Sequence, residues 1–319
     1  MREGPVVFLM GPTGAGKTAT VFALSRLLAI DVVSVDAAQI YRGLDVGTAK
    51  PSLAERRAVP HHLVDIRSVA ESYSAAAFCD DARRLIHAAW RRGRVPVLVG
   101  GSSFYFRALE HGLPEMPPAD EGLRAALMAE LADQGLAALY AELVARDPRR
   151  AAALAPTDPQ RIVRALEIVR TVGRVPEKAA STPWPASLLK FAISPRDRAL
   201  LHKRIATRFR RMLARGLIEE AMWLFGLNLP SGAPALRLVG YRQVGEYLRD
   251  KIPYNGLIEQ GSAATRQLAK RQLTWLRADA AVQWLDGDGP RGPEICAMAI
   301  RDAVDKVRGD PVGGLPMSQ

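Results

Sequence analysis

The sequence lacks the features that mark a secreted or membrane-bound protein. Only two cysteines occur in 319 residues, Cys79 and Cys296, and two isolated cysteines form neither a disulfide framework nor a metal-ligand pattern. No run of 18 uncharged apolar residues is present, so we expect no membrane span. The first residues, Met1 to Gly4, do not have the layout of a signal peptide. These absences predict a cytoplasmic protein.

The chain also has fewer acidic than basic residues. The chain has 44 Lys and Arg residues against 33 Asp and Glu residues, a net charge of +11. Residues 191–280 hold 16 of the basic residues and only 7 of the acidic ones. Such an excess implies an anionic partner, and its clustering favours contact with nucleic-acid phosphates. The alternative is an ordinary solvated basic surface.

Short apolar runs alternate with longer helical stretches along the chain. This alternation predicts an α/β fold, in which helices cover both faces of a parallel sheet. The expected strands are Val6–Met10, Val32–Val35, Leu63–Ile66, Val95–Val99, Leu188–Ile193 and Val282–Leu285. Lys17–Leu28 and Ala75–Arg92 are the expected helices between the early strands.

One interval between two strands has no strand signal. It contains three helical stretches, Gly122–Ala132, Gly135–Ala145 and Pro159–Val172, and its flanks are rich in proline. We therefore predict an all-helical subdomain at residues 118–182, inserted into a core formed by residues 1–117 and 183–308. The Gly/Pro-rich residues 309–319 are predicted to be a disordered tail.

A glycine-rich loop predicts a phosphate site. The run Gly-Pro-Thr-Gly-Ala-Gly-Lys-Thr follows an apolar strand and opens a helix, which matches G-x-x-x-x-G-K-[ST] in its required context. Backbone N–H groups converge on phosphate oxygens in such a loop, Lys17 adds a charge and Thr18 can bind Mg²⁺. The motif does not say which di- or triphosphate binds, so ATP stays open. The predicted diphosphate-binding residues are Gly11, Pro12, Thr13, Gly14, Ala15, Gly16, Lys17 and Thr18.

The acid that completes this site is not where a P-loop NTPase usually has it. The strand Val95–Val99 ends in Gly-Gly-Ser rather than in an Asp that helps to hold Mg²⁺. Asp36 instead ends the strand Val32–Val35, and the carboxyl ends of parallel strands share one rim. We predict that Asp36 faces the bound diphosphate as a general base; the alternatives are a loop cap or an acid that holds Mg²⁺ through water. The following loop, with Thr48 and Lys50, is expected to border a polyanion.

Seven motifs stand at residues 11–18, 34–41, 45–51, 99–102, 158–165, 239–243 and 265–277. Together they resemble one family, the tRNA dimethylallyltransferases, also called tRNA isopentenyltransferases. The resemblance extends from the P-loop to about Leu285. The chain has no Cys/His zinc-finger segment and so resembles the short bacterial form.

The resemblance implies a reaction and a set of catalytic residues. A dimethylallyl group moves from dimethylallyl diphosphate to N6 of the adenosine on the 3′ side of the tRNA anticodon, and pyrophosphate leaves. In the family the P-loop holds the diphosphate with Mg²⁺, and the adenosine is flipped into a channel on the opposite side. The implied catalytic residues are Asp36, Lys17, Thr18 and Arg208, with Thr18 as the metal ligand. Arg208 lies one helical turn after Arg204 and is expected to point at the pyrophosphate.

The same resemblance implies a tRNA-binding set. Asp158 and Pro159 are expected to cap a helix and present Gln160 at its exposed end. Tyr241, Arg242 and Gln243 suggest a stacking plane for single-stranded RNA. Two positions depart from the family, Ala37 in place of Ser and Ser102 in place of Thr. The implied residues are Asp36, Ala37, Ala38, Gln39, Ser102, Arg124, Gln160, Arg161, Ile162, Val163, Arg164, Arg237, Tyr241, Arg242, Lys270, Arg271, Trp275 and Arg277.

Three other functions remain open at this point. A P-loop kinase or NTPase would turn over ATP. An enzyme that prenylates free AMP or ADP would share the P-loop and Asp36, but it would not need the helical insert or the basic C-terminal half. A non-catalytic RNA-binding protein would not need Asp36 beside an intact P-loop. No obligate protein partner is evident, and we expect a monomer.

Overall fold

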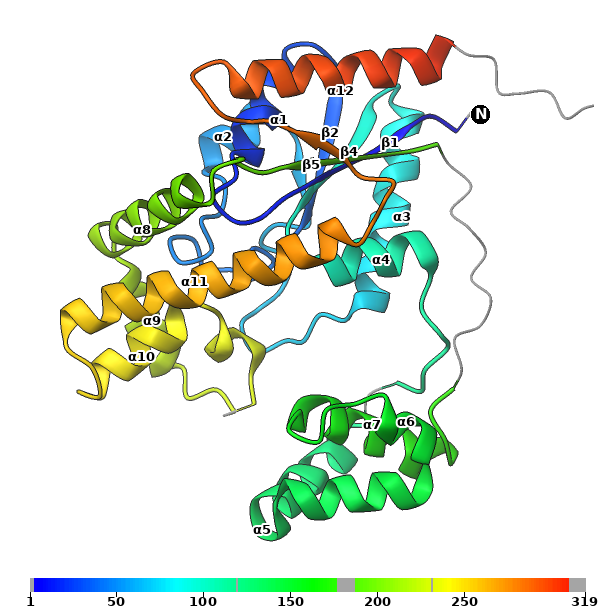
Figure 1. The fold of residues 1–319 in the computed structure, drawn as a ribbon, viewed down its shortest axis with the longest axis vertical. Coiled ribbons are helices and arrows are strands. Elements are labelled where there is room, and N and C mark those ends of the chain that lie inside the picture. Colours follow the sequence, from blue (N-terminus) through cyan, green and yellow to red (C-terminus); the bar gives the residue numbers. More distant parts are fainter. Residues whose placement is uncertain (1–2, 119, 177–186, 231, 310–319) are drawn as a thin grey trace, which may run out of the picture. The chain divides into compact units, whose positions relative to one another are not determined.

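A parallel sheet lies at the centre of the larger part of the molecule (Figure 1). The computed structural model describes residues 3–118, 120–176, 187–230 and 232–309. Within them the sheet has six strands in the order β3-β2-β4-β1-β5-β6, all paired in parallel, which confirms the predicted fold class. The strands are β1 (Val6–Met10), β2 (Ile30–Val35), β3 (His61–His62), β4 (Val95–Gly100), β5 (Leu188–Ile193) and β6 (Gln283–Leu285).

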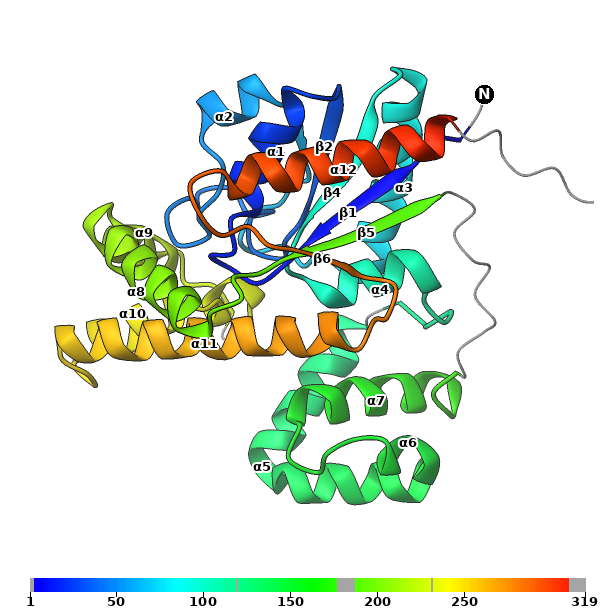
Figure 2. The same cartoon turned by 45° about the horizontal axis from the view of Figure 1, so that its top comes forward.

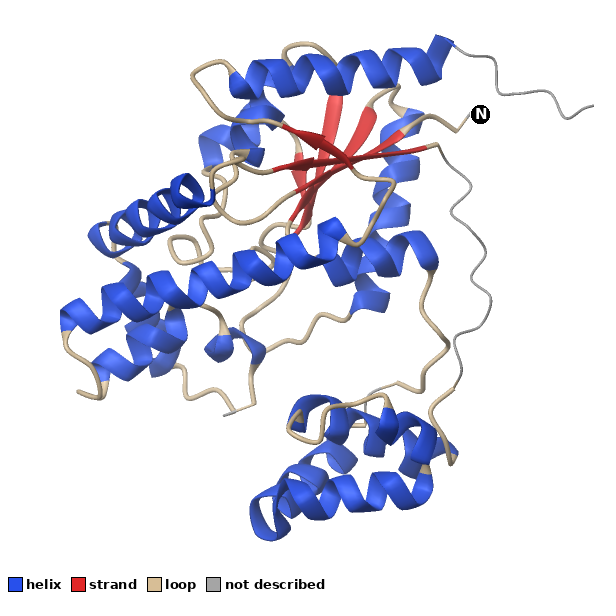
Figure 3. Ribbon diagram, in the orientation of Figure 1, coloured by secondary structure: helices blue, strands red, loops and turns tan. Residues whose placement is uncertain are grey.

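Helices cover both faces of this sheet (Figures 2 and 3). Helices α1 (Lys17–Ser25) and α12 (Gly292–Gly309) pack on one face, where Val7 and Leu9 join their apolar side chains in one core. On the other face, Phe8 packs its ring 4.8 Å from that of Phe106 in α4 (Ser103–His111), beside α3 (Ala75–Arg91). Because successive side chains of β1 enter opposite layers, the strand is apolar throughout.

The third predicted strand is wrong. Only His61 and His62 pair with β2, and the predicted residues 63–66 leave the sheet. Leu63 and Asp65 have φ angles of 60° and 58°, which a strand does not allow. Leu63 and Val64 are nevertheless buried, so their apolar character reflects a packed loop rather than a strand.

A second helical layer belongs to the same unit. Its core brings Phe209, Leu224 and Val244 together with Tyr41 and Leu44 from the loop after β2. This layer therefore holds the loop that follows the carboxyl end of β2. Its elements are α8 (Arg198–Ala214), α9 (Leu217–Gly226), the 3-10 helix η1 (Pro234–Arg237), α10 (Tyr241–Leu248) and α11 (Tyr254–Arg277); the short α2 (Leu53–Ala58) follows the loop.

Residues 111–183 form a separate compact unit, and residues 1–110 with 184–319 form the other. The smaller unit contains α5 (Glu121–Arg146), α6 (Pro148–Ala152) and α7 (Pro159–Val172) around an apolar core of its own. The expected break before Gly135 is present, because Gly135 has non-helical angles of φ 81° and ψ 168°. Asp158 caps α7 as predicted, accepting a hydrogen bond from the Arg161 N–H at 3.1 Å. That this unit binds an anticodon stem-loop stays a prediction.

Two observations concern the limits of the chain and of its helices. Apart from residue 309, the predicted disordered tail lies outside the described residues. Among the helices that the structure does describe, none is both long and apolar enough to cross a membrane.

Candidate active site

A cavity of about 950 Å³ opens at the carboxyl rim of the sheet. The phosphate loop lines it from Thr13 to Thr18, and Asp36 lines it from the end of β2. Arg204 and Arg208 reach it from α8, and Gln272 reaches it from α11. Residues that are far apart in the sequence thus meet around one polar cavity.

The phosphate loop ends where α1 begins. Gly16 is the N-cap, with φ 99°, a conformation that favours glycine. The first N–H groups of α1, at Lys17 and Thr18, have no acceptor within the helix and so suit an anion. The Lys17 ammonium donates to the carbonyls of Gly11 at 2.8 Å and Pro12 at 2.9 Å. Thr18 is exposed at the cavity.

Not all eight predicted loop residues can contact a diphosphate directly. Gly11 and Pro12 are buried and do not line the cavity, which corrects the prediction for them. A Cβ at Gly11 would lie 2.3 Å from the Ile193 carbonyl oxygen, so this glycine permits the loop to pass β5. The N–H groups of Thr13 and Ala15 donate within the protein, to the side-chain oxygen of Gln272 and to a carbonyl of the loop.

Three charged groups of the predicted catalytic set interact in this cavity. Burial, and then the positive charge of Arg208, lower the pKa of Lys17 to about 8, while the Asp36 carboxylate opposes this shift. Burial also lowers the pKa of Arg208, and Asp36 again opposes. Both cations are thus held without a full complement of counter-charge, which favours binding of an anion. Arg204 is less available, because it pairs with Asp288 at 3.4 Å.

Asp36 is oriented by its own turn. One carboxylate oxygen accepts a hydrogen bond from the Ala38 N–H at 2.8 Å, and the carboxyl group lines the cavity. Ala37, at the tip of this turn, is exposed. The arrangement fixes the carboxylate at the rim while leaving it accessible from the cavity.

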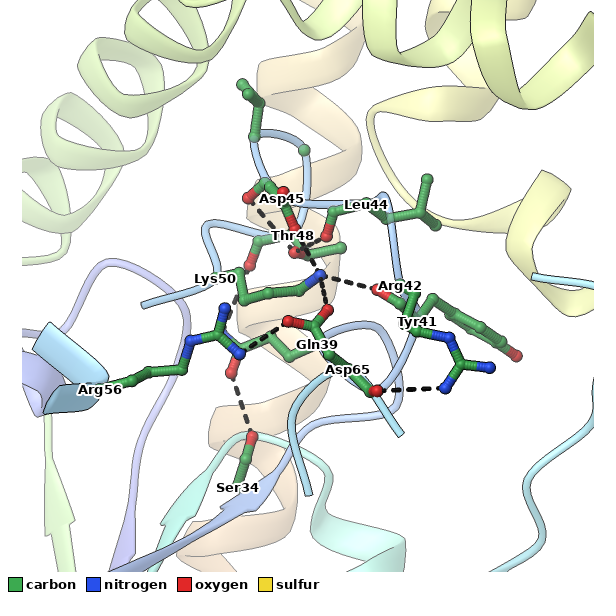
Figure 4. A network of polar contacts seen from close by, with 12 residues as sticks. Ser34, Gln39, Tyr41, Arg42, Leu44, Asp45, Thr48, Lys50, Arg56 and Asp65 are labelled. Carbon is green, nitrogen blue, oxygen red and sulfur yellow. Dashed lines mark hydrogen bonds and ion pairs between the residues drawn. The ribbon is translucent and has the colours of Figure 1, made fainter. Parts of the chain in front are cut away.

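The loop after Asp36 is held by a polar network (Figure 4). The Lys50 ammonium donates to the Tyr41 carbonyl at 2.7 Å and to Asp45 and Asp65 at 2.5 Å each. Its side chain is only 2% exposed, and the Thr48 hydroxyl donates to the Leu44 carbonyl. The loop borders the cavity, which Lys50 lines. The Thr48 and Lys50 side chains are already paired within the loop and stabilise it, and that the cavity holds a polyanion stays a prediction.

Gln39 also belongs to this network. Its side-chain oxygen accepts from the Ser34 hydroxyl at 3.0 Å, and its nitrogen donates to the carbonyls of Thr48 and Ala49 at 3.5 and 3.4 Å (Figure 4). Contact of the Gln39 side chain with tRNA, which the resemblance implies, would require these hydrogen bonds to be exchanged.

Glu220 is a functional residue that the sequence did not single out. Its carboxylate accepts from the N–H groups of Asp45, Val46 and Gly47 at 2.6–2.8 Å, and from the Tyr241 hydroxyl at 2.6 Å. It therefore anchors the loop whose residues line the cavity. The one sequence signal for Glu220 was that it is an acidic residue within the most basic stretch of the chain. No local motif accompanied it.

The same geometry corrects the role predicted for Tyr241. Its side chain is fully buried, and burial together with Glu220 raises the pKa of its hydroxyl. Gln243 is buried as well, and its oxygen accepts from the Gly240 N–H. Neither residue can stack on RNA, whereas Arg242 and the earlier Arg237 are exposed.

The exposed side of α11 carries the predicted RNA-binding residues. Lys270, Arg271 and Arg277 are exposed. Trp275 is 41% exposed, and the Arg107 guanidinium lies 4.6 Å from its ring centre. Ser102 follows β4 and donates its N–H to the Val35 carbonyl, next to Asp36. The contact of these residues with tRNA stays a prediction.

The predicted residues of the smaller unit divide into two groups. Gln160 and Arg161 are exposed at the start of α7. Ile162 and Val163 lie in the apolar core of the unit, so their side chains cannot bind RNA, which corrects the prediction. Arg124 and Arg164 both pair with Glu167, at 2.8 and 2.7 Å, and Glu167 is only 1% exposed. This one carboxylate therefore offsets one of their two positive charges.

The fold and this cavity define an α/β protein whose glycine-rich loop and basic side chains line one polar cavity at the carboxyl rim of a parallel sheet. The model of the IPP transferase family matches residues 39–279, and the chain belongs to that family. The chain is 54% identical to the tRNA dimethylallyltransferase of Thiobacillus denitrificans, over 88% of this chain and 91% of the relative. It is 48% identical to that of Bordetella pertussis, over 95% of this chain and 100% of the relative.

Solved structures agree with this family. The full-length tRNA isopentenylpyrophosphate transferase of Bacillus halodurans is 35% identical, with a TM-score of 0.70 over 96% of this chain and 98% of that one. A eukaryotic dimethylallyltransferase acting on tRNA shares the fold at 23% identity, with a TM-score of 0.80 over 98% of this chain and 81% of that one.

Proposed function

We propose that the protein transfers a dimethylallyl group from dimethylallyl diphosphate to N6 of the adenosine 3′ to the anticodon of tRNA. The observation that carries this proposal is the meeting of Lys17, Arg208 and Asp36 at one cavity. Two incompletely compensated cations suit a diphosphate leaving group, and a carboxylate beside them suits an amine that must lose a proton. The family's relatives carry names for this reaction.

The residues divide the reaction between them. The adenosine N6 forms a bond to C1 of the allyl group while the C1–O bond to the diphosphate breaks. Lys17, Arg208 and the first N–H groups of α1 stabilise the negative charge that develops on the leaving pyrophosphate. Asp36 accepts the proton that N6 loses.

A divalent metal fits this site through the diphosphate. Mg²⁺ keeps several waters and binds to one or two protein oxygens together with substrate phosphates. Thr18 is exposed at the cavity that Asp36 also lines, so the Thr18 hydroxyl is the proposed protein ligand. In the described residues, no cluster of three His, Cys, Asp or Glu residues forms a metal site of its own. When bound, the metal would neutralise charge on the pyrophosphate.

We propose RNA contacts for each unit by itself, on α11 in the larger unit and at the start of α7 in the smaller one. On α11, Lys270, Arg271 and Arg277 supply positive charge, and Trp275 supplies an aromatic face. In the smaller unit, the exposed Gln160 and Arg161 begin α7. We assign this unit to the anticodon stem-loop.

Mass spectrometry of nucleosides tests the function directly. We expect N6-dimethylallyladenosine in tRNA incubated with the protein, Mg²⁺ and dimethylallyl diphosphate, and far less of it after the same time when Asp36 is replaced by alanine. Free AMP and ADP serve as competing acceptors, and ATP replaces the allyl diphosphate in a parallel reaction. Prenylation of AMP or ADP in preference to tRNA, or release of phosphate from ATP without prenyl transfer, would contradict the proposal.

A further inference from the structure

Gln272 connects three segments that meet at the rim of the sheet. Its side-chain oxygen accepts the Thr13 N–H of the phosphate loop at 3.1 Å, and its side-chain nitrogen donates to the Gly101 carbonyl after β4 at 3.1 Å. The residue itself belongs to α11 and lines the cavity. One amide thus joins α11, the phosphate loop and the segment that follows β4.

The residue at position 101 leaves room for this bridge. A Cβ at Gly101 would lie 2.2 Å from the Gln272 nitrogen and 3.0 Å from its amide carbon. Any larger residue would therefore displace the amide. Gly101 is the residue before Ser102, whose N–H binds the Val35 carbonyl beside Asp36.

The chemistry of the bridge needs a neutral amide. The group must accept one hydrogen bond and donate another, and the side-chain amide of Gln carries an acceptor oxygen and a donor nitrogen on one planar carbon. A carboxylate would still accept from Thr13, but it would face the Gly101 carbonyl with another acceptor. It would also place a negative charge at the loop that is to receive a diphosphate.

The helix that carries Gln272 is also the basic helix. Lys270 and Arg271 are exposed immediately before it, whereas Gln272 is partly buried and turned to the cavity. Side chains two positions apart on a helix lie on different faces. The same helix therefore presents cations to solvent and holds the phosphate loop from its other side.

We propose that Gln272 is a positioning residue for the diphosphate, which holds the phosphate loop in register with the β4 rim and ties it to the basic helix α11. This rests on the proposed placement of the diphosphate in the phosphate loop. Gln272 does not contact the reacting atoms. It acts by keeping the Thr13 N–H engaged, so that the amides of α1 face the cavity in a fixed arrangement.

Steady-state kinetics of Gln272→Leu and Gln272→Glu test the proposal, with Gln267→Leu and Gln267→Glu as matched controls. Gln267 is an exposed glutamine on the same helix. Loss of two hydrogen bonds in Gln272→Leu should raise the KM for dimethylallyl diphosphate roughly tenfold, and Gln272→Glu should raise it further. The kcat at saturating diphosphate and the Kd for tRNA should change less than about threefold, because no tRNA-facing group is lost.

A second variant separates positioning from simple loss of stability. Gly101→Ala displaces the Gln272 amide while leaving the glutamine in place, and it should raise the same KM. The double variant Gly101→Ala/Gln272→Leu should resemble the worse single variant, because both changes break one bridge. Melting temperatures of all variants show whether the fold is retained.

The outcomes distinguish this inference from the proposed function. An unchanged KM in both Gln272 variants, additive effects in the double variant, or a loss confined to tRNA affinity would overturn the positioning role. Lys17→Ala serves as the reference for the site. If Lys17→Ala also leaves the KM for the diphosphate unchanged, the diphosphate does not bind in the phosphate loop and the proposed function fails as well.

Discussion

Lys17 and Lys50 are two shielded lysines on neighbouring loops at one rim, and they differ in their partners. Lys17 donates to two backbone carbonyls, and its pKa is lowered to about 8. Lys50 donates to two carboxylates and one carbonyl. A lysine whose charge is already neutralised stabilises the fold, whereas one that lacks a carboxylate partner is available to an anionic ligand. The hydrogen-bond and ion-pair partners of a lysine, rather than its residue type or burial, thus distinguish a ligand-binding lysine from a structural one.

The largest expected effect concerns Asp36, the carboxylate that follows β2. Asp36→Ala should lower the rate of single-turnover transfer by about 10²–10⁴, the usual cost of losing a general base. Affinity for both substrates should persist. Asp36→Asn controls for the turn, because its oxygen can still accept the Ala38 N–H. A rate within a few-fold of wild type in either variant would show that another group takes the proton.

Removing the Lys17 side chain should weaken binding of the diphosphate without lowering the stability of the fold. We expect Lys17→Ala to raise the KM for dimethylallyl diphosphate by at least about tenfold, because a charge-assisted contact to the diphosphate is lost. Its unfolding midpoint in urea should stay close to that of wild type. A variant that loses tRNA affinity instead would contradict the comparison with Lys50.

The lowered pKa of Lys17 predicts a pH dependence of binding. Below about pH 8 the ammonium is charged in the free protein, and above that pH it must take up a proton when the diphosphate binds. The Kd for dimethylallyl diphosphate should therefore rise above pH 8, by up to about tenfold per pH unit. Calorimetric titrations between pH 7 and 9.5 measure this slope. Lys17→Arg should flatten it, since a guanidinium stays charged.

Lys50 should give the opposite pattern. Lys50→Met leaves Asp65 with Arg56 as its remaining partner and removes the bond to the Tyr41 carbonyl. We expect the free energy of unfolding to fall by about 2 kcal/mol, measured in urea; the exposed Asp45 contributes little of this. The KM for the diphosphate should change less than that of Lys17→Ala. A large rise in KM with unchanged stability would show instead that Lys50 contacts the diphosphate.

The smallest expected effect concerns the salt dependence of tRNA binding. If Lys270 neutralises a phosphate, Lys270→Gln should reduce the slope of log K against log salt by roughly 0.7, the value for single-stranded RNA. Arg301→Gln on α12 is the control, because Arg301 pairs with Asp302 and lies on the helix that covers the sheet. Equal slopes for wild type and Lys270→Gln would show that the basic face of α11 is an ordinary solvated surface.

The sequence predicted the local features of this protein well. β1 and β5 have the predicted bounds, α7 begins at its predicted cap, and the phosphate loop joins β1 to α1. Each of these depends on a pattern within about 20 residues. The strand predicted at residues 63–66 was wrong, because buried loop residues and strand residues are equally apolar. The expected monomer and cytoplasmic location stay predictions.

Long-range partners explain the errors at the site. Tyr241 has an aromatic ring that could stack on a base. Only its burial and its hydrogen bond to Glu220, which the structure shows, reveal that its role is structural. Gln272 stands within a motif that carries the family resemblance, yet its bond to Thr13 spans 259 residues. A pattern within one segment cannot show which distant segment a side chain meets.

The carboxylate of Glu220 has a consequence for the order in which the chain folds on the ribosome. Asp45, whose N–H it binds, precedes it by 175 residues. At about 5–20 residues per second, the loop at residues 45–47 waits roughly 9 to 35 s after its own synthesis before Glu220 is made. During that interval its three amides lack their carboxylate, and a nascent chain that ends before α9 cannot complete this side of the cavity. The site is therefore completed late in synthesis, although the residues of its phosphate loop are among the first to be translated.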